Sequence, residues 1–232
     1  MTDLSPDFAG PVRLFPLPNV VLFPQVIQPL HIFEPRYCNL LEDALATDHL
    51  ITLALLQTGW ETDYEGRPPV HSIVCVGEII SHARLPENRH NVLLRGVHRA
   101  RILREIPAAE FGKYRQAMVK LLPNQHDPHS AGERGDRQAK LIELFRRFLP
   151  QSAQWEQQLD QLLSRPLDLG VLTDIVAFTA GFMVERKQQL LAETNVDRRA
   201  QALLQMLEQA LKHPESLLPP SRHEFPPPFS AN

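Results

Sequence analysis

The chain has 232 residues, of which 43% are apolar and 22% are charged, and this suits one large globular domain or two small ones. Its formal net charge of −3 gives no electrostatic reason to expect nucleic acid or an acidic membrane surface as the main partner. The two cysteines, Cys38 and Cys75, are too few for a disulfide framework and fit a reducing cytosol.

The first ten residues lack both the basic segment and the apolar segment of a signal peptide. No apolar run approaches the ~18 residues that a membrane-spanning helix needs. We therefore expect a cytoplasmic protein that has no membrane partner.

Up to residue 122, apolar residues come in short runs broken by proline and glycine, which predicts a strand-rich part. We expect Pro35 to lie in the first turn of a helix, which follows the third strand, and we expect a bend at Gly77 and a tight hairpin at Gly96-Val97. Mostly neighbouring strands joined by short turns favour an antiparallel, barrel-like sheet of six or seven strands. The extended segments are predicted at 12–15, 20–23, 26–33, 49–57, 70–85, 91–95, 98–106 and 114–122.

After a polar linker at 123–135, apolar residues recur at helical spacing. The segment 169–184 has one charge, Asp174, before its last residue, and we expect it to be a buried central helix. Thr194 or Asn195 can cap the final helix, and the proline-rich residues from 213 onward are expected to be extended. The fold class is therefore α+β, with helices predicted at 136–149, 153–163, 169–184, 185–193 and from 196 to about 211. The expected domains are a β-rich part at 1–122, the linker, a helical part at 136–212 and a tail at 213–232.

A search for catalytic and metal-binding motifs finds none. The chain has no glycine-rich phosphate loop, no G-x-S-x-G and no H-E-x-x-H. The nearest approach to a metal site is His126-Asp127-Pro128-His129, which lies in the polar linker, where a solvated loop is the better interpretation. We predict no catalytic residue, no metal and no cofactor.

The most basic stretch lies between residues 82 and 104. Arg99 and Arg101 alternate with apolar residues and should share one face of a strand. The polar outer face of a half-buried sheet explains them without a ligand. The alternative is a set of anion or RNA contacts made by Arg84, Arg95, Arg99 and Arg101.

Two blocks of the sequence, residues 14–24 (LFPLPNVVLFP) and 29–37 (PLHIFEPRY), closely resemble the opening of the Lon protease N-terminal, substrate-binding domain family. The resemblance continues at residues 76–79, 91–102 and 187–199 and covers about residues 12–211. Departures from the family pattern are Gln25, where the family often has glycine, and Ala192 and Arg199 in the last block.

The resemblance implies a pseudo-barrel of the PUA-like type with one inserted helix, followed by a helical bundle. It also implies a stand-alone module that binds polypeptide substrates or a partner protein and acts in protein quality control. The module is expected to be non-enzymatic, because the ATPase and Ser-Lys protease parts of Lon have no counterpart in this sequence. The candidate binding surface is Phe15, Phe23, Phe33, Arg36 and Tyr37, although the same residues would serve to hold the first helix on the barrel. An RNA-binding module and an enzyme with an unrecognised site are the alternatives, and the oligomeric state is left open.

Overall fold

The computed structural model describes residues 8–63, 66–107, 113–149, 157, 159–161, 163–164 and 167–213. The contacts within the chain form two units that divide between Pro123 and Asn124. Most of the helix predicted at 153–163 and all of the expected tail after His213 lie outside the described residues.

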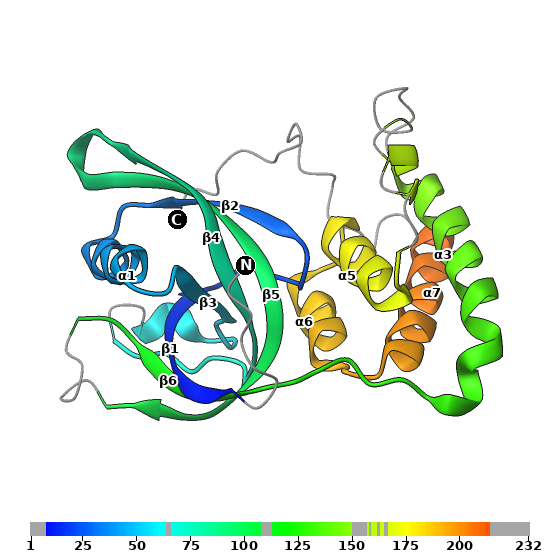
Figure 1. Cartoon of the computed structure of the whole chain (residues 1–232), viewed down its shortest axis with the longest axis horizontal. Helices are drawn as coiled ribbons and strands as arrows, with labels where there is room; N and C mark the ends of the chain where they lie inside the picture. Colours follow the sequence, from blue (N-terminus) through cyan, green and yellow to red (C-terminus); the bar gives the residue numbers. More distant parts are fainter. Residues whose placement is uncertain are drawn as a thin grey trace. The chain divides into compact units, whose positions relative to one another are not determined.

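The first unit is built on one six-stranded sheet (Figure 1). Its spatial order is β2-β5-β4-β3-β1-β6, and β5 also pairs with β6, so five of the strands close into a barrel while β2 is added outside the ring. The pairing of β1 with β3 is parallel and the other pairings are antiparallel, which confirms a mostly antiparallel barrel. The strands are β1 Ala9–Leu17, β2 Ile27–Ile32, β3 Leu50–Leu55, β4 Ile73–Leu85, β5 Arg89–Ile106 and β6 Gln116–Leu121.

Valine, leucine and alanine side chains fill the barrel. Along β6, every second residue is buried, as expected for a strand with one face in a core. All six residues of β3 are buried. Such side chains pack well on a pleated surface, and the main cluster consists of Val12, Leu14, Leu50, Ala54, Val74, Val76, Ala100, Ala117, Val119 and Leu121.

The hairpin predicted at Gly96-Val97 is wrong. β5 runs unbroken through Gly96, and the chain reverses instead at the short 3-10 turn η2 (Pro86–Asn88), where Glu87 and Asn88 have φ of 62° and 54°. The register of β4 and β5 shifts between Val76 and Gly77, which pair with His98 and Gly96, so the extra residue is Val97 on β5. The bend predicted at Gly77 stays a prediction.

The strand predicted at 20–23 is also absent, so the inserted helix α1 (Pro35–Ala46) follows the second strand and not the third. Pro35 occupies its first turn as expected. A second 3-10 turn, η1 (Trp60–Asp63), lies in the loop between β3 and β4.

The second unit contains four described helices, α3 (Arg134–Phe148), α5 (Leu169–Thr179), α6 (Val184–Ala192) and α7 (Val196–Lys212). The apolar run predicted as one helix to residue 184 ends at Thr179, because Ala180 adopts an extended conformation with ψ 139°. Asn195 caps α7 by accepting a hydrogen bond from the Arg198 amide.

The residues expected to form a linker are ordered parts of the helical unit. The amide of Gln125 donates to Thr194 O and its carbonyl accepts from Val196 N, which joins this strand-like segment to the start of α7. The 3-10 turn η3 (Pro128–Glu133) then leads directly into α3. In the part of the chain that the structure describes, no helix is long and apolar enough to cross a membrane.

Candidate polypeptide-binding surface

The side chain of Tyr37 connects α1 to the barrel. Its ring packs on Phe15 of β1 at a centroid distance of 4.3 Å, and the Arg36 guanidinium lies 4.8 Å from the same ring on the α1 side. Phe15 is completely buried and Tyr37 is 6% exposed. These two members of the predicted surface are therefore core residues. This agrees with the alternative interpretation, in which they hold the first helix on the barrel.

Phe23 is completely buried as well. Its carbonyl oxygen approaches the backbone of Gly96, and the neighbouring Gln25 amide donates to Gly96 O at 2.8 Å. The segment between β1 and β2 is thus packed on β5 without forming a strand. Of the five residues predicted as a binding surface, only Phe33 (40% exposed) and the partly exposed Arg36 can meet a ligand in this conformation.

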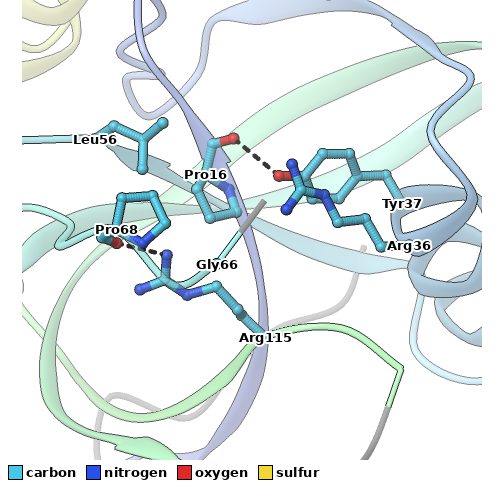
Figure 2. A pocket seen from close by; sticks show the side chains of 7 residues that line it. All are labelled: Pro16, Arg36, Tyr37, Leu56, Gly66, Pro68 and Arg115. Atoms are coloured by element: carbon cyan, nitrogen blue, oxygen red, sulfur yellow. Dashed lines mark hydrogen bonds between the residues drawn. The ribbon is translucent and has the colours of Figure 1, made fainter. Parts of the chain in front are cut away.

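A small recess lies beside Arg36 and Tyr37 (Figure 2). It has room for about one water molecule. Its two arginines already have partners within the protein. Arg36 forms an ion pair with Glu34, and Arg115 donates to Pro68 O at 2.8 Å and pairs with Glu105. The recess is lined by Pro16, Arg36, Tyr37, Leu56, Gly66, Pro68 and Arg115, and it is too small for an organic substrate.

A larger surface is formed where three strands run side by side outside the closed barrel. We call this the outer sheet: residues 27–32 of β2 with Phe33 directly after them, residues 89–95 of β5 and residues 78–85 of β4. Its register pairs Pro29 with Leu93 and His31 with Asn91 on one side of β5, and Leu93 with Ser81 on the other. Figure 1 shows β4 and β5 extending together from the barrel.

The two faces of the outer sheet differ in burial. On β2 and β5, the face that carries Leu30, Ile32, His90, Val92 and Leu94 is buried. The opposite face, which we call the outer face, carries exposed Ile27 (38%) and Phe33 (40%), together with residues of the same strand parity on β5 and β4. Those residues are half-buried Leu93, half-buried His31 and exposed Ala83.

Polar contacts fix the geometry of this face without covering its apolar residues. Arg95 and Glu78 form an ion pair across β5 and β4. His31 Nδ1 lies 2.8 Å from Asn91 Oδ1, and its ring is 5.9 Å from that of Phe33. A rigid sheet with separated apolar side chains is suited to contact extended chain segments of varied sequence.

A histidine pair lies on the opposite face. His82 Nε2 is 2.8 Å from His90 Nδ1, and the two rings are stacked. Burial and the nearby His82 lower the pKa of His90, whose Nε2 has no described hydrogen-bond partner. Protonation of both rings would break this hydrogen bond and place two like charges together.

The four arginines predicted as anion contacts do not form a common surface. Arg99 is only 2% exposed and Arg95 is paired with Glu78, whereas Arg84 and Arg101 are exposed. A nucleic acid could reach two of the four directly.

Titratable side chains also converge around Asp43 in the first unit. Asp43 accepts hydrogen bonds from the Tyr114 hydroxyl and from Arg13 Nε, and these bonds hold the pKa of Asp43 below its usual value. Arg13 also donates to Asp48 Oδ1 at 2.7 Å and to Thr47 Oγ1 at 2.6 Å. These contacts fasten β1 to the end of α1.

The described residues contain no group of three His, Cys, Asp or Glu side chains that could hold a metal ion. In the segment His126–His129, the Asp127 carboxylate caps η3 through the His129 amide. The prediction that this segment is not a metal site stays a prediction.

Residues 11–209 match the family model described as the ATP-dependent protease La (LON) substrate-binding domain. The chain belongs to this family. The match contains both the outer sheet and the helical unit, and it includes every residue of the candidate surface.

Curated Lon proteases are similar to the chain along most of its length. It is 29% identical to Lon protease 1 of Syntrophobacter fumaroxidans over 199 residues, 86% of this chain and 23% of that protein. It is 27% identical to Lon protease 2 of Sorangium cellulosum over 218 residues, 91% of this chain and 26% of that protein. The chain thus spans about a quarter of the length of these relatives.

Solved structures show the same fold. The N-terminal domain of Mycobacterium avium complex Lon protease has a TM-score of 0.67 at 16% identity, covering 86% of this chain and 98% of that one. A Lon N-terminal domain protein from Xanthomonas campestris has a TM-score of 0.57 at 20% identity, covering 88% and 98%. The Lon N-terminal fold, predicted from the motifs, is thereby confirmed.

The sequence reasoning missed Ile27, Leu93 and Ala83 as members of the outer face. Alternation within residues 27–33 gives one signal, since Ile27, His31 and Phe33 share a parity. Leu93 could not be found in this way, because residues 92–94 are continuously apolar and either parity could have been the buried one.

Proposed function

We propose that this chain is a non-catalytic module that binds segments of polypeptide, and that the outer face of the outer sheet is the contact surface. The family match over residues 11–209 carries the proposal, because that family is described as a substrate-binding domain of a protease. A protease substrate is a polypeptide, so polypeptide is the ligand class that this membership supports.

The geometry supports a surface contact and not a pocket. The described recess holds about one water molecule, while Ile27 and Phe33 are exposed on a sheet held by ion pairs and hydrogen bonds. Apolar side chains on a stiff support can bind exposed apolar segments at a small cost in conformational entropy. Unfolded or damaged chains expose such segments, so a role in protein quality control follows from the same surface.

A non-catalytic role is supported by the contacts that the polar side chains make within the fold. Arg36, Arg115 and Asp43 each have ion-pair or hydrogen-bond partners within the fold. Both cysteines are buried, and neither takes part in a disulfide bond in the described structure, which fits the proposed setting in a reducing cytoplasm.

The test measures binding of an unfolded, fluorescently labelled polypeptide, such as a reduced and carboxymethylated model protein, by anisotropy. Phe33→Ser and Ile27→Ser should each raise the Kd by about tenfold, since each removes a large apolar contact. Leu103→Ser is the matched control, because Leu103 is 58% exposed on β5 but lies outside the outer sheet. Equal effects of Phe33→Ser and Leu103→Ser would show that the outer face is not the site.

RNA binding has less support. Arg99 is buried and Arg95 is paired, so the predicted basic stretch does not present four available cations. An electrophoretic shift by single-stranded RNA at low salt, lost in Arg84→Ala together with Arg101→Ala, would favour that alternative.

A further inference from the structure

The outer sheet has an edge that none of the described strands covers. β4 pairs with β3 up to Glu78, and the Ile79 amide still donates to His49 O at 2.8 Å. From residue 80 to Leu85, β4 has β5 as its one neighbour among the described strands. Residues 80–84 are all exposed.

The register determines which backbone groups face this open edge. In an antiparallel ladder, successive residues direct their N–H and C=O groups alternately to the two neighbours. The Gly96 amide donates to the carbonyl oxygen of Val26, directly before β2. Leu93 and Asn91 are an odd number of residues from Gly96, so their N–H and C=O groups face β4. Their partners Ser81 and Ala83 therefore bond β5, and the N–H and C=O groups of His82 and Arg84 face outward.

The opposite edge of the outer sheet is closed to another strand. By the same alternation, the backbone groups of Pro29 face away from β5, and proline has no N–H to donate at this edge. Its carbonyl oxygen accepts a hydrogen bond from Gln28 Nε2 at 2.7 Å, so that acceptor is occupied too. Proline on an edge strand is a common protection against strand addition, and the edge of β4 lacks it.

We propose that the edge of β4 at residues 80–85 is a strand-addition site for an extended polypeptide segment that carries a carboxylate side chain. Main-chain groups of the segment pair with those of His82 and Arg84, as in other proteins that bind peptides by adding a strand. This inference rests on the proposed function and specifies how the polypeptide is held.

Charge at this edge favours an acidic segment. No described carboxylate lies within ion-pair distance of exposed Arg84, whose guanidinium donates to the neutral Asn88 Oδ1 at 3.3 Å. Arg89, on the other side of the turn between β4 and β5, is already paired with Glu87 at 3.5 Å. A carboxylate opposite Arg84 would add a charge-assisted contact to the main-chain pairing.

Proline variants test the backbone directly. Arg84→Pro and His82→Pro remove an outward N–H without removing a bond to β5, and Arg84→Ala and His82→Ala are their matched controls for the side chains. The probe is a fluorescent peptide of alternating valine and threonine with one central glutamate. We expect each proline variant to bind it about tenfold more weakly than the matching alanine variant, whereas equal affinities would overturn the proposal.

Amide exchange in the unsubstituted protein gives a second readout that does not depend on how well a variant folds. Saturation with the same peptide should slow exchange of the His82 and Arg84 amides about tenfold or more, while the amides of Ser81 and Ala83 are protected from the start. Unchanged exchange at His82 and Arg84 in the presence of bound peptide contradicts strand addition.

Two further outcomes separate this inference from its alternatives. If the protein alone, at high concentration, protects the same amides, the occupant is a second copy and the proposed polypeptide occupant is wrong. If unfolded polypeptide binds the proline variants normally but binds Phe33→Ser weakly, the edge proposal falls while the proposed function stands.

Discussion

A β-carbon on residue 96 would overlap the carbonyl oxygen of Phe23, so Gly96 allows the segment before β2 to lie against β5. The contact is with backbone, which cannot move aside as the end of a flexible side chain can. It is supported by the hydrogen bonds that Gln25 and Val26 make with the backbone of Gly96.

Gly96→Ala should therefore lower the free energy of unfolding by about 1–3 kcal/mol, because the inserted methyl group forces the two backbones apart. Urea unfolding followed by circular dichroism measures this change. Gly135→Ala is the control, since nothing lies within 4 Å of the added atom at this helical position. It should be neutral or stabilise by up to about 1 kcal/mol, and an equal loss in both variants would contradict the steric explanation.

Gln25→Gly should stabilise the protein. Gln25 has φ 65°, in the left-handed region that favours glycine, and it stands where the Lon family often has glycine. Relief of this strain outweighs the greater freedom of glycine in the unfolded chain by about 0.5–1 kcal/mol. Thermal unfolding would measure the gain, and Gln25→Val, which is β-branched at positive φ, should lose stability; a destabilised glycine variant would argue against strain at this position.

Arg199→Ala should destabilise the chain by about 3–5 kcal/mol, because it leaves a buried carboxylate without its cation. Arg199 is 0% exposed, lies 3.3 Å from Asp174 Oδ1, and donates to Thr173 Oγ1 and to Glu193 O. The double variant Arg199→Met with Asp174→Leu should recover part of the loss, as measured by denaturant unfolding. A double variant as unstable as the sum of the two single variants would show that the pair itself is not the cause.

Lys187 should make stability increase at alkaline pH. Burial lowers the pKa of Lys187 to about 8, although its ammonium donates to Phe178 O at 2.6 Å near the end of α5. The unfolded chain keeps this proton to higher pH, so between the two pKa values it binds more protons than the folded chain. The free energy of unfolding should then rise by about 1–2 kcal/mol between pH 7 and 9.5.

Lys187→Met provides the comparison for this pH effect. Its unfolding free energy should lack the alkaline increase, while all other groups titrate as in the parent chain. Equal pH profiles of the two proteins in urea unfolding would mean that Lys187 is not a buried cation.

The strand positions on either side of Gly96 show what the sequence can and cannot predict. The extended segments at 91–95 and 98–106 were correctly predicted, but Gly96 was assigned to a turn because glycine is the usual signal for one. Its real requirement is a close approach by Phe23, a residue distant in sequence. Local patterns carry no information about such a contact.

The end of α5 has a similar explanation. Residues 169–184 are apolar enough to predict one buried helix, yet the helix ends at Thr179 and α6 begins at Val184. The Lys187 side chain, supplied by α6, reaches back to Phe178 O. A tertiary contact therefore stabilises a break that helical periodicity alone does not indicate.

Among the candidate site residues, the motif does not indicate which side chains are exposed. Phe15 and Phe23 are aromatic residues among prolines, and nothing local distinguishes them from Phe33, which is exposed. Phe23 and Phe33 lie outside the strands, so strand alternation cannot separate them, and their burial depends on which distant segments pack against them.

Closure of the barrel has a consequence for synthesis of the protein. Ala9 of β1 pairs with Lys120 of β6, so the ring cannot form until both ends of this long stretch have left the ribosome. At about 5–20 residues per second, the first strand waits on the order of ten seconds for its last partner. Pairings so distant along the chain also form slowly. Until they form, the nascent barrel exposes unpaired strand edges, and these edges can aggregate or bind a chaperone.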